Sequence, residues 1–151
     1  MLLTELLTPD RIKVPLEAGD KPRVIRELTQ LLALRSGADF AVILAAVEER
    51  EQVLSTGIGY GIAIPHAKSA SVRTLELVCG SSPVGVPFDA LDGEPVRLFF
   101  MLVGPEDIAG QHVKALSRIA RVVRRESVRE SLLKARTPSE FHQVLVDAEE
   151  R

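Results

Sequence analysis

The residue whose type and setting best suit chemistry is His66, which follows Pro65 directly behind a run of alternating glycines. An unperturbed imidazole has a pKa of about 6.5, so at neutral pH it is mostly uncharged, nucleophilic and able to accept and release a phosphoryl group. Proline fixes its own φ and keeps the preceding Ile64 extended. We therefore predict a short strand over residues 62–66 that presents His66 at its end. From this pattern alone, a histidine that merely caps a turn is the alternative.

Three glycines, Gly57, Gly59 and Gly61, alternate just before this strand. Glycine lets the backbone turn sharply and approach another group closely, and the N–H groups of such loops often surround anions. A P-loop would continue with Gly-Lys-Ser/Thr, and a dinucleotide fingerprint would open a helix, but neither follows here. Residues 55–61 are therefore predicted to form a loop that is compatible with an anion.

The segments around this motif predict alternating strands and helices. Apolar residues alternate over residues 12–16, which predicts a first strand. Asp20 and Asp39 are predicted to cap two helices, the first of which ends at Gly37, because aspartate accepts hydrogen bonds from the first N–H groups of a helix. Buried strands are predicted over residues 75–79 and 96–103, with a turn around Asp92 and Gly93 between them.

The last third of the chain reads as helical. His112, Ile119 and Val123 share one face of a predicted third helix. Ser127 and Thr137 each precede a glutamate and are predicted to start two further short helices. The order of one strand, two helices, several strands and then helices predicts an α/β layered domain with a mixed sheet.

Composition narrows the classes of protein. The chain has 151 residues, of which 46% are hydrophobic, and its 19 basic and 21 acidic residues give a net charge of −2. This predicts one domain, residues 1–151, with no affinity for nucleic acid or an anionic membrane. The lone cysteine Cys79 fits a reducing compartment, and neither a secretion signal nor a membrane span is visible, so we expect a cytoplasmic protein. Cys79 is expected in the core, His142 in a surface or packing position, and Arg121, Arg124 and Arg125 on a solvated helix face.

Residues 55–66, which read Ser-Thr-Gly-Ile-Gly-Tyr-Gly-Ile-Ala-Ile-Pro-His, resemble the phosphorylation motif of enzyme IIA domains. These are the fructose, mannitol and nitrogen-regulatory type of the bacterial phosphoenolpyruvate-dependent phosphotransferase system. The likeness extends over nearly the whole chain and includes residues 49–51, 88–93 and 110–112. It implies a three-layer α/β/α fold with a mixed central sheet, as in the mannitol IIA domain.

The resemblance also implies residue roles. It makes His66 the phosphoryl acceptor, with Arg50 and His112 beside it and Thr56, Gly57, Gly59 and Gly61 as a phosphate loop. An arginine can donate two parallel hydrogen bonds to phosphoryl oxygens, and a helix start favours an anion. Without the resemblance, Arg50 would be read as a solvated charge at a helix end, and His112 as a packing histidine.

Three functions are compatible with this sequence. The first is a nitrogen-type regulatory module that accepts phosphate from the phosphocarrier protein HPr and binds target proteins according to its phosphorylation. The second is a sugar-specific IIA that passes phosphate to a IIB; since the sequence contains no IIB or IIC segment, that acceptor would be a separate protein. The third, ranked lowest, is a metal-dependent enzyme that uses His66, His112 and Glu51, although no histidine pair has ligand spacing. No cofactor is expected.

Overall fold

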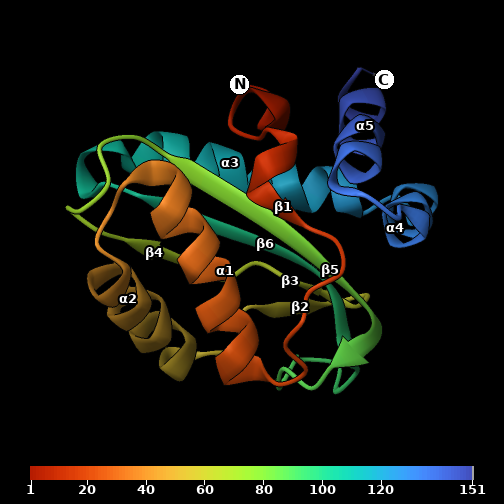
Figure 1. The fold of residues 1–151 in the computed structure, drawn as a ribbon, viewed down its shortest axis with the longest axis horizontal. Coiled ribbons are helices and arrows are strands. Elements are labelled where there is room, and N and C mark those ends of the chain that lie inside the picture. Colours follow the sequence, from red (N-terminus) through yellow and green to blue (C-terminus); the bar gives the residue numbers. More distant parts are fainter. Residues whose placement is uncertain (151) are drawn as a thin grey trace.

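A mixed sheet of six strands forms the centre of the computed structural model, which describes residues 1–150 (Figure 1). The strand order is β1-β5-β6-β3-β2, with β4 also paired to β6. The long strands β5 and β6 are antiparallel, whereas β1 runs parallel to β5, and β3 and β4 run parallel to β6. The strands are β1 (Ile12–Lys13), β2 (Gly57–Gly59), β3 (Ile62–Ala63), β4 (His66–Lys68), β5 (Glu76–Val86) and β6 (Val96–Gly104).

Helices cover both faces of this sheet, which confirms the predicted three layers (Figure 1). Helices α1 (Lys21–Ser36) and α2 (Phe40–Val53) pack on one face, and α3 (Ala109–Val123), α4 (Glu126–Lys134) and α5 (Pro138–Glu149) on the other. Strand β6 shows why: its alternate residues Phe99 and Met101 enter the core under α1 and α2, while Phe100 and Leu102 enter the opposite core. Short 3-10 turns lie at Leu3–Glu5, Pro9–Arg11 and Glu106–Ile108.

Local capping fixes most helix ends where the sequence predicts them. The Asp20 and Asp39 carboxylates accept the N–H groups of Arg23 and Val42, at 3.0 and 3.2 Å, and start α1 and α2. Thr137 caps α5 in the same way. The predicted Ser127 cap is wrong: the N-cap is Arg125, two residues earlier, and α4 begins at Glu126, in the register that buries Val128 and Leu132.

Three predicted strand features differ from the structure because of proline and pairing. The first strand ends at Lys13, since Pro15 has no N–H to donate. Residues 55–61 are not a loop, because Gly57 and Gly59 form β2, which pairs with β3. The predicted strand over residues 62–66 is interrupted at Pro65, so His66 begins β4 and does not end a strand.

The hairpin formed by β2 and β3 depends on glycine at two positions. Gly61 lies in the turn at a positive φ angle, and Gly57 packs closely against a neighbouring segment. Tyr60 and Gly61 both adopt positive φ angles, of 57° and 76°. Gly57 packs so tightly that a Cβ atom on it would lie 2.7 Å from the Cβ of Ala90. The glycines therefore shape the hairpin that leads into β3 and β4, and these two strands both pair with β6 at Leu98 and Leu102.

Candidate functional site

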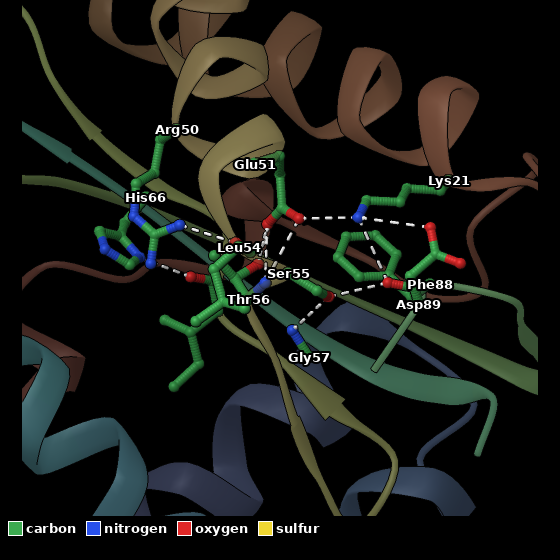
Figure 2. A network of polar contacts seen from close by, with 11 residues as sticks. Lys21, Arg50, Glu51, Leu54, Ser55, Thr56, Gly57, His66, Phe88 and Asp89 are labelled. Carbon is green, nitrogen blue, oxygen red and sulfur yellow. Dashed lines mark hydrogen bonds and ion pairs between the residues drawn. The ribbon is translucent and has the colours of Figure 1, made fainter. Parts of the chain in front are cut away.

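The pairing of strand β4 with β6 positions His66. It is the first residue of β4, it pairs with Leu102 of β6, and its side chain is half-buried. The ring atom Nδ1 lies 2.8 Å from the carbonyl oxygen of Ile64 (Figure 2). A carbonyl oxygen can only accept, so this contact assigns the ring proton to Nδ1 and leaves the lone pair on Nε2.

The surroundings of His66 keep the ring neutral. Burial is the main cause that lowers its pKa below the ordinary value, and the Arg50 guanidinium adds to this effect. The hydrogen bond to Ile64 and the Glu51 carboxylate act in the opposite direction and raise the pKa. A net lowering means that at neutral pH the imidazole is unprotonated at Nε2, which is the form that attacks an electrophile.

His112 faces His66 from helix α3. Its side chain is 3% exposed, and the two ring centroids lie 5.8 Å apart at an interplanar angle of 62°. Within residues 1–150 no group hydrogen-bonds its Nδ1. Burial lowers the pKa of His112, as do His66 and Lys68 nearby. The site therefore contains two neutral imidazoles that face each other at its base.

Arg50 comes from the last turn of α2. Its Nη1 donates a 2.8 Å hydrogen bond to the carbonyl oxygen of Leu54, where the helix ends, and Figure 2 shows its guanidinium beside His66. This contact fixes the side chain and leaves further N–H groups of the guanidinium for an anion.

A cleft of about 560 Å³ joins these groups. Arg50, His66, His112 and Lys68 all line it together with Glu49, so two cationic side chains, two imidazoles and one carboxylate meet in one concave space. Its rim includes Val53 and Val113, which are 79% and 64% exposed. Such a combination suits an anionic group delivered by a macromolecule that covers an apolar rim.

The structure brings together three of the predicted site residues and leaves the others aside. Arg50, His66 and His112 line the cleft, but Thr56, Gly57, Gly59 and Gly61 do not. Thr56 is buried and donates both its N–H and its hydroxyl to Glu51. These residues form a hairpin outside the cleft, in which Gly57 and Gly59 pair with β3 and the Gly57 N–H donates to the Ser55 hydroxyl. Their role as a phosphate loop stays a prediction.

Lys68 is a cationic lining residue that sequence reasoning missed. It follows His66 by two positions on β4, and residues two apart on a strand point to the same face, so the spacing itself was the available signal.

The remaining candidates lie away from the cleft. Cys79 is fully buried, and burial raises the pKa of its thiol well above the ordinary value, which confirms a core position. His142 is half-buried with its Nε2 3.1 Å from the Leu7 carbonyl oxygen. Arg121 and Arg124 are exposed as predicted, whereas Arg125 is half-buried and donates to the Ala148 carbonyl.

Residues 1–150 offer little to a metal-dependent or membrane-spanning function. No cluster of three or more His, Cys, Asp or Glu side chains is arranged around a common point for a metal ion in that range. The Glu51 carboxylate, which a metal site would need, is instead occupied by Lys21 at 2.9 Å and by Thr56. None of the helices in this part of the chain has the length and apolar character needed to cross a membrane.

Known proteins match both the sequence and the fold. The family described as Phosphoenolpyruvate-dependent sugar phosphotransferase system, EIIA 2, matches residues 5–148. A nitrogen regulatory protein of Pseudomonas aeruginosa is 36% identical over 148 residues, covering 97% of this chain and 96% of that protein. The fructose-specific EIIABC component of Bacillus subtilis is 42% identical over 137 residues, which are 89% of this chain and 21% of that longer protein. The structure of nitrogen regulatory protein IIA-Ntr from Neisseria meningitidis matches with a TM-score of 0.89 and 35% identity, covering 95% of this chain and 98% of that one.

Proposed function

Because the chain belongs to the EIIA 2 family of the phosphoenolpyruvate-dependent sugar phosphotransferase system, we propose that it carries a phosphoryl group on Nε2 of His66. Membership confirms the resemblance that the sequence motif predicts. The observation that supports the acceptor atom is the hydrogen bond from Nδ1 to the Ile64 carbonyl, since it leaves Nε2 as the only ring nitrogen with a free lone pair.

The proposed transfer needs no proton to move. The lone pair of Nε2 attacks phosphorus, the bond from phosphorus to the donor breaks, and the donor leaves with that electron pair. As Nε2 gives up its lone pair the ring becomes positive, and the Ile64 carbonyl stabilises the proton on Nδ1. The ring also remains a good leaving group, which suits onward transfer.

The cleft supplies charge for the oxygens that develop negative charge during this transfer. Arg50 and Lys68 are cations that line it, and His112 adds a ring N–H. Such groups stabilise the transition state because they are already oriented by the protein before the reaction begins. The donor is a phosphorylated HPr-type carrier, which presses its own surface against the exposed Val53 and Val113.

Within the family we place this chain with the nitrogen-regulatory members. The support is the 36% identity to a Pseudomonas aeruginosa nitrogen regulatory protein over nearly the full length of both chains. A phosphate adds close to two negative charges at His66, which changes which target proteins can bind over the cleft. The alternative is a sugar-specific IIA that passes phosphate to a IIB, and it is favoured by the 42% identity to the fructose-specific EIIABC component of Bacillus subtilis.

Mass spectrometry of the intact protein tests the acceptor. After incubation with phosphoenolpyruvate, enzyme I and HPr, the wild-type chain should gain one phosphate, and His66→Ala should gain none while keeping its circular dichroism spectrum. A fully phosphorylated His66→Ala variant, or an unmodified wild-type protein, would contradict the proposal. The phosphorylated protein is then mixed with a fructose-type IIB: rapid loss of its phosphate would favour the sugar-specific alternative over the regulatory one.

A further inference from the structure

A pair of opposite charges, the buried carboxylate of Glu51 and the half-buried ammonium group of Lys21, lies behind His66, on the other side of the segment that ends α2 (Figure 2). The Glu51 side chain is 5% exposed and its Oε2 lies 2.9 Å from Nζ of Lys21, the first residue of α1. The same carboxylate accepts the N–H of Thr56 at 3.1 Å and the Thr56 hydroxyl. A buried carboxylate is tolerated only when it is paired and hydrogen-bonded, and here both conditions are met.

Hydrogen bonds connect this pair to the reactive ring. The carbonyl oxygen of Thr56 accepts the N–H of Ile64 at 3.0 Å. The carbonyl oxygen of Ile64 then accepts the Nδ1 proton of His66 at 2.8 Å. Ile64, whose carbonyl oxygen sets the His66 tautomer, is therefore held through its N–H by Thr56, a residue that Glu51 anchors.

Lys21 is itself fixed by groups distant in sequence. Its Nζ donates to the Phe88 carbonyl at 3.3 Å and lies 4.7 Å from the centre of the Phe88 ring. The Ser55 hydroxyl donates to the same carbonyl at 2.8 Å and accepts the N–H of Gly57. The Phe88 carbonyl oxygen thus accepts hydrogen bonds both from Lys21, at the start of α1, and from Ser55, which in turn accepts the N–H of Gly57 on the other side of Thr56.

We propose that Lys21 and Glu51 are a positioning pair for the phosphoryl transfer, an inference that rests on the function proposed above. Glu51 fixes Thr56, and through it the Ile64 carbonyl that keeps the proton on Nδ1 and the lone pair on Nε2. Lys21 neutralises Glu51, so that the carboxylate does not oppose the incoming phosphoryl oxygens. Neither residue lines the cleft, and neither touches the reacting atoms.

Lys21 and Glu51 carry opposite charges, so removing one or the other should change the pKa of His66 in opposite directions. This distinguishes an effect on His66 from a general loss of stability. The charged groups around His66 are Arg50, Glu51 and Glu49 of α2, Lys68 of its own strand and the imidazole of His112 on α3. Lys21→Met leaves Glu51 uncompensated and should raise the pKa of His66. Glu51→Gln removes the buried negative charge and leaves Lys21 with only the exposed Asp89 carboxylate, 3.9 Å away, so it should lower the pKa of His66. A loss of packing alone would not move the pKa in opposite directions.

Nitrogen chemical shifts of the His66 ring, followed against pH, report both its pKa and its tautomer without any phosphoryl donor. We expect Lys21→Met and Glu51→Gln to shift the pKa in these opposite directions, to reduce the population protonated at Nδ1, and to slow uptake from phosphorylated HPr by about tenfold. Lys21→Arg should restore most of the rate. Glu48→Gln removes an exposed carboxylate on the same helix and should change none of the three: the pKa of His66, its tautomer population or the rate of uptake.

Unchanged His66 shifts and an unchanged rate in folded Lys21→Met and Glu51→Gln would overturn the positioning role. If Lys21→Met does not fold, Lys21→Gln, which keeps a donor for Glu51, decides by the same readouts. Should the shifts move as expected while the wild-type chain takes no phosphate from HPr, the proposed function fails and the positioning of His66 stands.

Discussion

The His66 and His112 rings meet edge to face, with centroids 5.8 Å apart, although they come from a strand and a helix 46 positions apart in the chain. The relationship explains why burial and mutual repulsion both lower the pKa of His112. Two such rings cannot easily be protonated together at this distance. Both rings are therefore mostly neutral at pH 7, which is the protonation state that the proposed nucleophile His66 requires.

Replacing His112 should slow transfer without removing the acceptor. His112→Ala loses the ring N–H beside the phosphoryl oxygens, and we expect the rate of phosphate uptake to fall by about 10- to 100-fold while one phosphate is still gained in the end. Stopped-flow or quench measurements with phosphorylated HPr give the rate. His142→Ala is the matched control, because His142 contacts Leu7 away from the cleft. An equal rate in His112→Ala and wild type would return His112 to a packing role.

Arg50→Lys should be a damaging substitution in spite of the conserved charge. The guanidinium donates to the Leu54 carbonyl and still has N–H groups for an anion, whereas an ammonium group is a point charge without the planar fork. We expect uptake to slow by about tenfold and the end of α2 to become more mobile in hydrogen exchange. Arg121→Lys, at an exposed position on α3, serves as the control. A rate within twofold of wild type in Arg50→Lys would show that only the charge matters.

Acid should destabilise the fold through these two histidines. Burial lowers the folded-state pKa of His66 and of His112, while both should titrate near 6.5 in the unfolded chain. Below that pH the unfolded state binds protons that the folded state does not, so the free energy of unfolding falls as the pH drops through the lowered pKa values. Above it these groups contribute no pH dependence.

Urea unfolding of wild type and His112→Gln between about pH 7.5 and about pH 5 checks this sign. The variant should lose less stability on acidification than the wild type, because one of the two groups no longer titrates. Carboxylates contribute to both proteins equally, so the difference isolates the histidine. A steeper loss in the variant would contradict the assignment of a neutral, buried ring.

Local signals in the sequence predict where most helices begin, whereas the extent of the strands depends on pairing between distant segments. Asp20, Asp39 and Thr137 cap helices as predicted because a cap needs only the next three residues. The loop predicted for residues 55–61 is wrong because the pairing of Gly57 with Ala63 depends on β6, which supports β3 from far along the chain. Strand β5 continues to Val86 because β6 pairs with it beyond the apolar run.

The site residues also divide into those that the local sequence indicates and those that it does not. His66 stands out from its own neighbours, Pro65 and the glycines, whereas Arg50 and His112 could be assigned only through the family resemblance. The contact between Lys21 and Glu51 joins helices α1 and α2 across 30 positions, and no periodicity in the sequence indicates it. Lys68 could have been found, because the strand period places it on the same face as His66.

The glycines before His66 should act through the fold and not as phosphate ligands. In Gly57→Ala the added methyl group would lie 2.7 Å from the Cβ of Ala90 and 2.9 Å from its Cα, so strand β2 and the segment at Ala90 must separate. We expect a loss of about 1–3 kcal/mol in the free energy of unfolding. Gly110→Ala is the matched control: nothing lies within 4 Å of the new methyl group, the residue is in helix α3, and alanine there should add about 0.5–1 kcal/mol. Thermal and urea unfolding measure both. If Gly57→Ala were as stable as wild type yet accepted phosphate at least tenfold more slowly, the close backbone approach that Gly57 allows would belong to the phosphoryl site after all, as the sequence predicts.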